Sequence, residues 1–342
     1  MDNNENMQES KPKAHNMYHA EPMASVVLAV HGGAGRDIVR GKRGDSHDDA
    51  CRNGLTNALR AGYAVLQRGG AALDAVEAAV RVLEDDPHFN AARGASLALN
   101  GKAELDASVM DGATGGAGAV AGITTVKNPV TLARAVMEKS SFVFLVAPGA
   151  EEFADTLDLE RVSNDYFITP EREAQRQRLL AQGGGFTVTA AVPEDPQDQK
   201  LGTVGAVARD RSGNLAAATS TGGMAGKRHG RVGDSPLIAA GTWAENRTCA
   251  VSCTGHGEYF IRHAVAYDIA ARMKYAGVSL GEASGETLHE VTQSGGDGGL
   301  IALDAQGNAT LPFNTPGMYR GYITEDGSVY VSIYREEHLN QV

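Results

Sequence analysis

The sequence predicts one layered domain of the α/β or α+β class, in which helices cover sheets. Apolar, strand-like runs come in groups along the chain, and amphipathic helical stretches lie between the groups. The 42 glycines gather in turn motifs and show no collagen or linker period. A chain of 342 residues can bury a substantial core, and elements that each hide one apolar face must stack as layers.

The N-terminal region begins with a polar stretch, residues 1–24, which we expect to be a disordered tail. The apolar run 25–30 then predicts a buried strand that ends in the glycine turn His31-Gly-Gly-Ala-Gly35. We interpret His31 as a structural hydrogen-bonding residue. A phosphate cradle is the alternative for this turn, but the turn lacks a P-loop lysine and the spacing of a dinucleotide fingerprint.

Two amphipathic helices follow, each with an apolar stripe at helical spacing. The stripes are Leu55, Leu59, Gly62 and Leu66, then Leu73, Val76, Val80 and Leu83. The second helix stops near Pro87, in an acid-rich turn that runs to Arg93. The acidic side chains of this turn either ligate a hard cation or form a solvated helix end.

The remaining apolar runs predict further strands and helices in alternation. Strands are expected at 95–99, 104–110, 117–121, 142–146, 204–209, 215–219, 248–252, 298–303, 309–312, 318–322 and 329–334, the first three in one antiparallel sheet. Helices are expected at 129–139, 149–156, 258–275 and 281–292. Charge rises over 157–202, which we interpret as a flexible connector with one exposed helix.

Composition excludes several classes of function. The net charge of −11 argues against nucleic-acid binding, which needs a basic surface. No apolar run reaches the length of a membrane span, and the first is too short for a secretory signal, so we expect a cytoplasmic protein that binds neither membrane nor nucleic acid. The cysteines Cys51, Cys249 and Cys253 lack metal-site spacing and are expected to be reduced and buried.

One stretch carries specific chemistry, the run Leu201-Gly-Thr-Val-Gly-Ala-Val-Ala208. A cut between Gly202 and Thr203 would give Thr203 a free α-amine, which can act as the base for its own hydroxyl. The preceding glycine leaves the backbone free to adopt the strained conformation that self-cleavage needs. The alternative is that the same letters simply start a strand.

Five motifs stand together in this chain: His31-Gly-Gly-Ala-Gly35, Gly202-Thr-Val-Gly-Ala-Val-Ala208, Thr219-Ser-Thr-Gly-Gly223, Gly230-Arg-Val-Gly-Asp-Ser-Pro236 and Ser252-Cys-Thr-Gly255. In this order they resemble the plant-type (type III) L-asparaginases that are also isoaspartyl peptidases, which are N-terminal nucleophile hydrolases. The resemblance covers residues 25–336 and is weakest in the connector.

The resemblance implies a four-layer αββα sandwich that matures by self-cleavage. An α subunit would span 1–202 and a β subunit 203–342. The two would form one domain, and αβ units would pair as a dimer. The implied reaction is hydrolysis of L-asparagine or a β-aspartyl dipeptide through a β-aspartyl ester on Thr203, with no cofactor for the chemistry.

The resemblance also assigns roles to residues of this chain. Thr203 matches the nucleophile, and Thr221 matches the threonine that hydrogen-bonds it. Arg231 and Asp234 match the substrate clamp, Thr254 and Gly255 match the oxyanion-hole donors, and Gly257 belongs to the same binding segment. Asn90 matches a residue beside the Gly202–Thr203 cleavage site. Backbone carbonyls of a sodium-binding loop match Leu83, Glu84, Asp86, Phe89, Ala91 and Arg93.

The clamp also follows from the residues themselves, because an amino-acid head group carries one carboxylate and one ammonium. Arg231 offers a planar fork for the first and Asp234 the opposite charge for the second. A surface ion pair is the alternative for these two residues. His256 and Ala92 depart from the family pattern, and they leave substrate preference and the shape of the cation loop open.

Three rival functions stay open. The first is a glycosylasparaginase acting on sugar-linked asparagine, against which the absence of a secretion signal argues. The second is a protease that cuts after Asp, which usually carries larger insertions. The third, from a different class, is a non-cleaving small-molecule-binding protein on the same fold.

Overall fold

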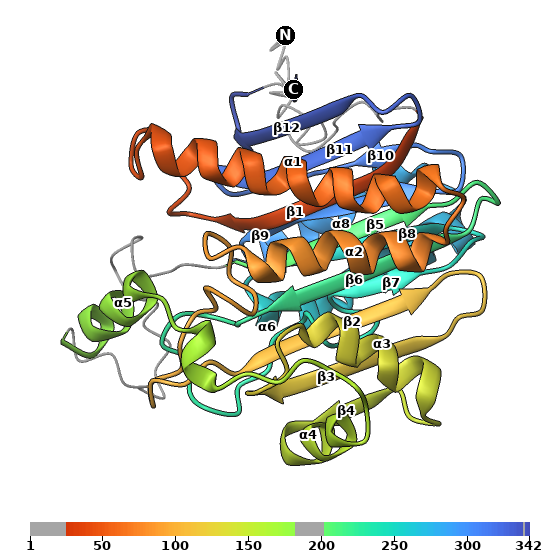
Figure 1. Ribbon diagram of the computed structural model, residues 1–342. Coiled ribbons are helices and arrows are strands. Elements are labelled where there is room, and N and C mark those ends of the chain that lie inside the picture. The colour runs from red at the N-terminus through yellow and green to blue at the C-terminus, as the bar shows by residue number, and fades with distance from the viewer. Residues whose placement is uncertain (1–24, 182–201, 338) are drawn as a thin grey trace, which may run out of the picture.

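The computed structural model describes residues 25–181, 202–337 and 339–342, and these residues form an α+β fold (Figure 1). Two sheets are described. The larger has the strand order β13-β12-β11-β1-β5-β6-β2-β3-β4, and the smaller has the order β10-β9-β8-β7. The expected tail at 1–24 and the connector segment 182–201 lie outside the described residues.

The strands of the larger sheet are β1 (Val26–Gly35), β2 (Leu105–Asp111), β3 (Ala117–Ile123), β4 (Phe144–Val146), β5 (Val204–Arg209), β6 (Leu215–Thr221), β11 (Gly317–Thr324), β12 (Val329–Tyr334) and β13 (Asn340–Gln341). Those of the smaller sheet are β7 (Thr242–Ala244), β8 (Cys249–Gly255), β9 (Gly298–Asp304) and β10 (Ala309–Thr310). Neighbouring strands are antiparallel except β3 and β4. The central strands β1, β5 and β6 are buried along almost their whole length, which explains their continuous runs of small and apolar residues.

The helices are α1 (Asp45–Gln67), α2 (Ala72–Asp85), α3 (Pro129–Lys139), α4 (Ala147–Asp155), α5 (Pro170–Ala181), α6 (Gly257–His263), α7 (Val265–Ala271) and α8 (Leu280–Gln293). A 3₁₀ turn spans Asn164–Phe167 and a π turn spans Arg272–Ala276. Figure 1 shows α1 and α2 lying across the larger sheet, and both pack on its central strands. Helices α7 and α8 pack on the smaller sheet.

Three apolar clusters fill the spaces between these elements. The first, with Leu28, Leu55 and Leu83, joins α1 and α2 to the larger sheet; the second, with Met110, Val207 and Ile301, lies between the sheets; the third, with Phe260, Ile269 and Leu300, joins the smaller sheet to α6–α8. All three cysteines lie among the described residues, are buried, and form no disulfide bond, as expected. No helix among the described residues is long and apolar enough to cross a membrane.

Two expected elements differ from the structure. Residues 95–99 form no strand and make only an isolated bridge from Leu97 to Ala103. The helix expected over 258–275 is broken at Ala264, where a left-handed backbone (φ 47°) separates α6 from α7. Ala is a strong helix former, so the break is imposed by packing on the smaller sheet and not by local preference.

The connector expected over 157–202 is packed in its described part. Phe167 is fully buried in the first apolar cluster, and the side chain of Arg172 in α5 is buried as well. Its Nε donates to the Gly94 carbonyl at 2.5 Å. The segment 157–181 is therefore packed against the domain. The expected exposed helix of the connector is α5, and its Arg172 side chain holds it in place.

Candidate active site

The nucleophile candidate Thr203 directly precedes β5, in the centre of the larger sheet. Strand β5 lies between β1 and β6, with Gly205 opposite His31 on one side and Thr219 on the other. A Cβ at Gly33 (φ 112°) would lie 2.9 Å from Gly202 Cα and 3.2 Å from Thr203 N. Glycine at this position therefore lets β1 approach the Gly202–Thr203 peptide closely.

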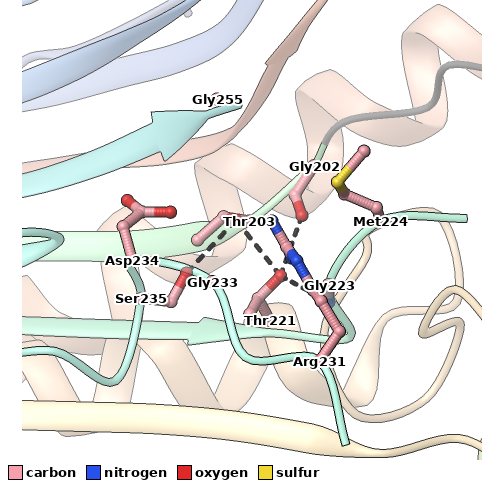
Figure 2. Close-up of a pocket in the computed structure, with 10 residues that line it drawn as sticks. All are labelled: Gly202, Thr203, Thr221, Gly223, Met224, Arg231, Gly233, Asp234, Ser235 and Gly255. Atoms are coloured by element: carbon pink, nitrogen blue, oxygen red, sulfur yellow. Dashed lines mark hydrogen bonds between the residues drawn. The ribbon is translucent and has the colours of Figure 1, made fainter. Parts of the chain in front are cut away.

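The Thr203 side chain is buried and faces two other hydroxyl groups (Figure 2). Its Oγ1 donates to Thr221 Oγ1 at 3.1 Å and lies 3.5 Å from Ser235 Oγ. Thr221 ends β6 and donates in turn to the Gly202 carbonyl at 3.0 Å. A hydrogen-bonded path thus runs from the Thr203 hydroxyl through Thr221 to the carbonyl that self-cleavage would attack.

The same carbonyl has a second donor in Asn90. Asn90 Nδ2 donates to Gly202 O and to Gly223 O, both at 2.7 Å, and Asn90 Oδ1 accepts from Ser96 N at 2.6 Å. These bonds fix the amide, so the expectation that Asn90 lies beside the cleavage site is met by its geometry. Two donors on one carbonyl oxygen polarise the bond and favour attack at its carbon.

Arg231 and Asp234 line the same pocket as Thr203, but they do not pair with each other as a surface ion pair would. Asp234 is buried and its Oδ2 has no hydrogen-bond partner. Burial raises the pKa of Asp234 to about 7, against the attraction of Arg231. A buried carboxylate with an unused oxygen suits an incoming cationic group.

The guanidinium of Arg231 is held by Glu258, which the sequence analysis did not select. Arg231 Nε and Nη2 reach the two carboxylate oxygens of Glu258 at 3.0 and 2.8 Å. Partial burial raises the pKa of Glu258, but its bonds and attraction to Arg231 outweigh that effect and leave the pKa lowered. His256 Nε2 lies 3.3 Å from the same carboxylate, and burial lowers the pKa of this histidine.

The segment 254–257 combines buried and pocket-lining positions. Thr254 is fully buried and accepts from Ala34 N at 3.3 Å, which leaves its own proton free to be donated. Gly255 lines the pocket with φ 155°, and a Cβ there would lie 2.7 Å from Phe260 and from Gly298. A Cβ at Gly257 would lie 2.9 Å from Asp234 Oδ1 and 3.0 Å from Arg231 Nη2, so this glycine packs directly against the clamp.

The pocket therefore gathers most of the expected residues and adds four that were not selected. It is lined by Gly202, Thr203, Thr221, Gly223, Met224, Arg231, Gly233, Asp234, Ser235 and Gly255 (Figure 2). Ser235 and Gly233 stood inside the 230–236 motif, so the motif itself was the signal for them. No pattern in the sequence pointed to Met224, whose side chain lies at the pocket only because the chain turns after β6.

The loop expected to hold a cation is described in full. The Glu84 carbonyl accepts from Arg93 N at 2.9 Å, and the Asp86 carbonyl accepts from Phe89 N at 3.2 Å. The Glu84 side chain points elsewhere, because its Oε1 accepts from Ser220 Oγ at 2.6 Å and from Val130 N at 3.0 Å. No group of three His, Cys, Asp or Glu side chains that could hold a metal occurs in the described part of the chain.

Comparison with known proteins gives consistent matches over most of the chain. The family model described as asparaginase matches residues 24–333. An isoaspartyl peptidase of Salmonella typhimurium is 50% identical over 92% of this chain and all of its own length, and one of Escherichia coli is 49% identical over 92% of this chain and 98% of its own. A probable isoaspartyl peptidase/L-asparaginase of Arabidopsis thaliana is 40% identical over 91% of this chain and all of its own length.

Proposed function

The chain belongs to the asparaginase family, and from that membership and the pocket around Thr203 we propose that it is a self-cleaving threonine amidohydrolase. It hydrolyses β-aspartyl (isoaspartyl) peptides and L-asparagine to L-aspartate plus an amino acid or ammonia. The observation that carries the proposal is the path from Thr203 through Thr221 to the Gly202 carbonyl, set in a pocket that also holds Arg231 and Asp234.

Maturation uses that path directly. The Thr203 hydroxyl attacks the Gly202 carbonyl carbon while its proton passes to Thr221, and Thr221 passes its own proton to the carbonyl oxygen. Asn90 stabilises the charge that develops on that oxygen, because its amide already donates to it. The C–N bond then breaks as the proton on the tetrahedral oxygen moves to the Thr203 nitrogen, which leaves as the free α-amine. Water hydrolyses the resulting ester, which frees the Gly202 carboxylate and returns the Thr203 hydroxyl.

Hydrolysis of the substrate repeats the attack with a different base. The freed α-amine of Thr203 accepts the hydroxyl proton as the oxygen attacks the side-chain carbonyl of the substrate. The leaving amine takes that proton, and water then hydrolyses the β-aspartyl ester. The Gly255 N–H and the free proton of Thr254 are the proposed donors to the oxyanion. The reaction requires no metal or organic cofactor, since the enzyme's own amine supplies the base.

The clamp orients the substrate through its two opposite charges. Asp234 binds the α-ammonium of the substrate through its unpartnered Oδ2. The α-carboxylate of the substrate replaces Glu258 as the partner of the Arg231 guanidinium. Gly257 belongs to this subsite, because a side chain there would collide with both clamp residues. Fixing both ends of the head group holds the scissile carbonyl against Thr203 and lowers the barrier to attack.

We also propose the four-layer αββα sandwich and a structural sodium ion. The packing of α1 and α2 on one sheet, of the sheets on each other, and of α7 and α8 on the second sheet supports the layer order. Backbone carbonyls in the loop 83–93 would hold the sodium. Supporting this, the Phe89 carbonyl lies 2.8 Å from the Cβ position of Gly94, and the Pro87 carbonyl also converges there. No step of the reaction passes through that ion.

The assembly proposed for the enzyme is a dimer of αβ units. Exposed apolar side chains at one end of the larger sheet support self-association, namely Phe142, Val143, Phe144 and Val146 on and beside the edge strand β4. The small-molecule substrate is the only other partner proposed. The cytoplasmic location and the division into subunits at Gly202 stay predictions.

The experiment that tests the function compares wild type with Thr203→Ala. Wild type should run as two fragments on a denaturing gel, with a new N-terminus at Thr203, and should hydrolyse both L-asparagine and a β-aspartyl dipeptide. Thr203→Ala should remain one band without activity, because it lacks the attacking hydroxyl. Thr310→Ala is the matched control, since it removes a buried hydroxyl from β10 that makes no hydrogen bond.

The outcomes separate the rival functions. An intact, inactive wild-type chain that binds aspartate would support the non-cleaving binding protein. Turnover of sugar-linked asparagine in preference to both proposed substrates would support the glycosylasparaginase. Full cleavage of the Thr203→Ala chain would remove Thr203 from the role of nucleophile.

A further inference from the structure

A row of buried hydroxyl groups crosses the space between the two sheets, next to β5. Ser108 and Thr219 lie opposite each other in β2 and β6, and Thr242 and Ser252 lie opposite each other in β7 and β8. All four side chains are fully buried. Thr219 Oγ1 lies 2.5 Å from Thr242 Oγ1 and 2.7 Å from Ser252 Oγ, and Ser108 Oγ lies 2.8 Å from Thr242 Oγ1. We call these four residues the hydroxyl row.

Both ends of the hydroxyl row reach the neighbourhood of Thr203. At one end Ser252 Oγ lies 2.9 Å from His31 Nε2, and His31 Nδ1 lies 2.9 Å from the Thr203 carbonyl. At the other end Ser108 Oγ donates to the Ser235 carbonyl at 2.7 Å, and Ser235 Oγ approaches the Thr203 hydroxyl. The row therefore links the backbone of the nucleophile to the loop that carries Asp234 and Ser235.

Between Thr242 and His31 the hydrogen bonds of the row can run in only one direction. A carbonyl oxygen only accepts, so His31 Nδ1 must carry the proton that it shares with Thr203. Burial lowers the pKa of His31 to about 3, so the ring is neutral and its Nε2 can only accept, from Ser252. Ser252 must then accept from Thr219, and Thr219 from Thr242. From Thr242 to His31 each hydroxyl therefore has one defined partner to donate to, which makes this part of the row stiff. Ser108 has one proton and two acceptors, Thr242 Oγ1 at 2.8 Å and the Ser235 carbonyl at 2.7 Å, and it donates to one of them at a time.

The apolar surroundings of the hydroxyl row make the loss of any one of its hydrogen bonds costly. The row lies beside the apolar cluster between the sheets, which includes Val207, Ala250 and Ile301. In such a medium a polar group without a partner is costly, so loss of one hydroxyl strands its neighbours. The row is nevertheless outside the pocket lining, so it touches no substrate.

We propose that the hydroxyl row is a positioning network, which holds the Thr203 backbone and the Asp234–Ser235 loop at the separation that attack requires. Thr219 is its central positioning residue, because it joins the two sheets through both Thr242 and Ser252. The inference rests on the proposed function, since it concerns the rate of the same reaction. It predicts that breaking the row slows turnover more than it weakens substrate binding.

The test compares Thr219→Val with Thr219→Ser in the mature enzyme. Valine keeps the shape of threonine and removes the hydroxyl, whereas serine keeps the hydroxyl. Turnover of a β-aspartyl dipeptide is measured per mature active site, which is counted from the fragment bands on a gel. We expect Thr219→Val to lower kcat by roughly tenfold or more with KM changed less than about threefold, and Thr219→Ser to restore most of kcat.

A second variant and a control keep the result decisive. Ser108→Ala breaks the row at its far end and should lower kcat in the same way. This variant tests the proposal if Thr219→Val does not fold. Thr310→Val removes a buried hydroxyl of the smaller sheet that is outside the row, and should keep wild-type kcat. Melting temperatures are measured in parallel.

The outcomes distinguish this inference from the function on which it rests. If wild type is active and the row variants melt earlier but keep kcat, the row is only structural and the inference is overturned. A serine variant as slow as the valine variant would also overturn it. An inactive wild type would overturn the proposed function together with the inference.

Discussion

Gly205 should be intolerant of even one added methyl group, because it leaves the space through which His31 reaches Ser252. A Cβ at Gly205 would lie 2.5 Å from His31 Nε2 and 3.0 Å from the Ala218 carbonyl, and would overlap Ser252 Oγ. Forcing a methyl group into a packed core costs ~1–3 kcal/mol. Losing the buried bond between His31 and Ser252 costs a similar amount. Gly205→Ala should therefore lower the free energy of unfolding by about 2–6 kcal/mol.

The measurement is urea unfolding, followed by the fluorescence of Trp243, the single tryptophan of the chain. All variants carry Thr203→Ala, so that one uncut chain unfolds. Gly149→Ala is the matched control, because a Cβ at that helical position meets nothing within 4 Å. It should be neutral or stabilising by up to ~1 kcal/mol.

A double variant identifies the cause of the loss. Ser252→Ala removes the oxygen that the new methyl group would overlap, so Gly205→Ala should cost less in its presence than in its absence, by at least ~0.5 kcal/mol. Two effects that simply add would show that the methyl group and the hydroxyl do not compete for one space. An unchanged urea midpoint for Gly205→Ala would refute the steric reasoning altogether.

Three further outcomes follow from the charged groups. Glu258→Gln should lower KM for L-asparagine a few-fold with kcat unchanged, because a competing carboxylate leaves Arg231; a raised KM would mean that Glu258 instead holds Arg231 in place. The pKa of Asp234 is about 7, so this carboxylate gains a proton as the pH drops from 7 to 5 and no longer attracts the substrate ammonium. We therefore expect kcat/KM to fall over this pH range, and a flat profile would contradict the assignment. Burial raises the pKa of Glu84 to about 8, above its value in the unfolded chain. The stability that the protonated Glu84 contributes is therefore complete below pH 4.5 and is lost as the pH rises to 8. Chemical unfolding of Glu84→Gln at several pH values should show a smaller change of the unfolding free energy with pH than wild type.

The sequence predicted the strands and helices wherever the pattern was long and periodic. Strands β5, β6 and β9 and helices α3 and α8 lie within two residues of their predicted ranges. The errors occur where tertiary packing decides the conformation. The left-handed backbone of Ala264 and the burial of Phe167 in the supposed connector both depend on partners distant in sequence.

The candidate site was predictable for a different reason, since its residues stand in short motifs. His31 is the structural hydrogen-bonding residue that its position suggested, with both ring nitrogens engaged. The pairing of Glu258 with Arg231 could not be predicted, because a spacing of 27 residues carries no periodic signal. The same holds for Gly205, whose glycine is required by a histidine and a serine on two other strands.

The one-way order of the hydroxyl row limits how this protein can change by mutation. Losing any single member strands its neighbours in an apolar layer, whereas replacing adjoining members together by apolar side chains leaves fewer of them stranded. Replacing one member of the row should therefore destabilise the protein more than replacing two adjoining members together by apolar residues. Libraries that randomise these positions one at a time would miss functional combinations, and lineages that diverge there should exchange several residues as a block.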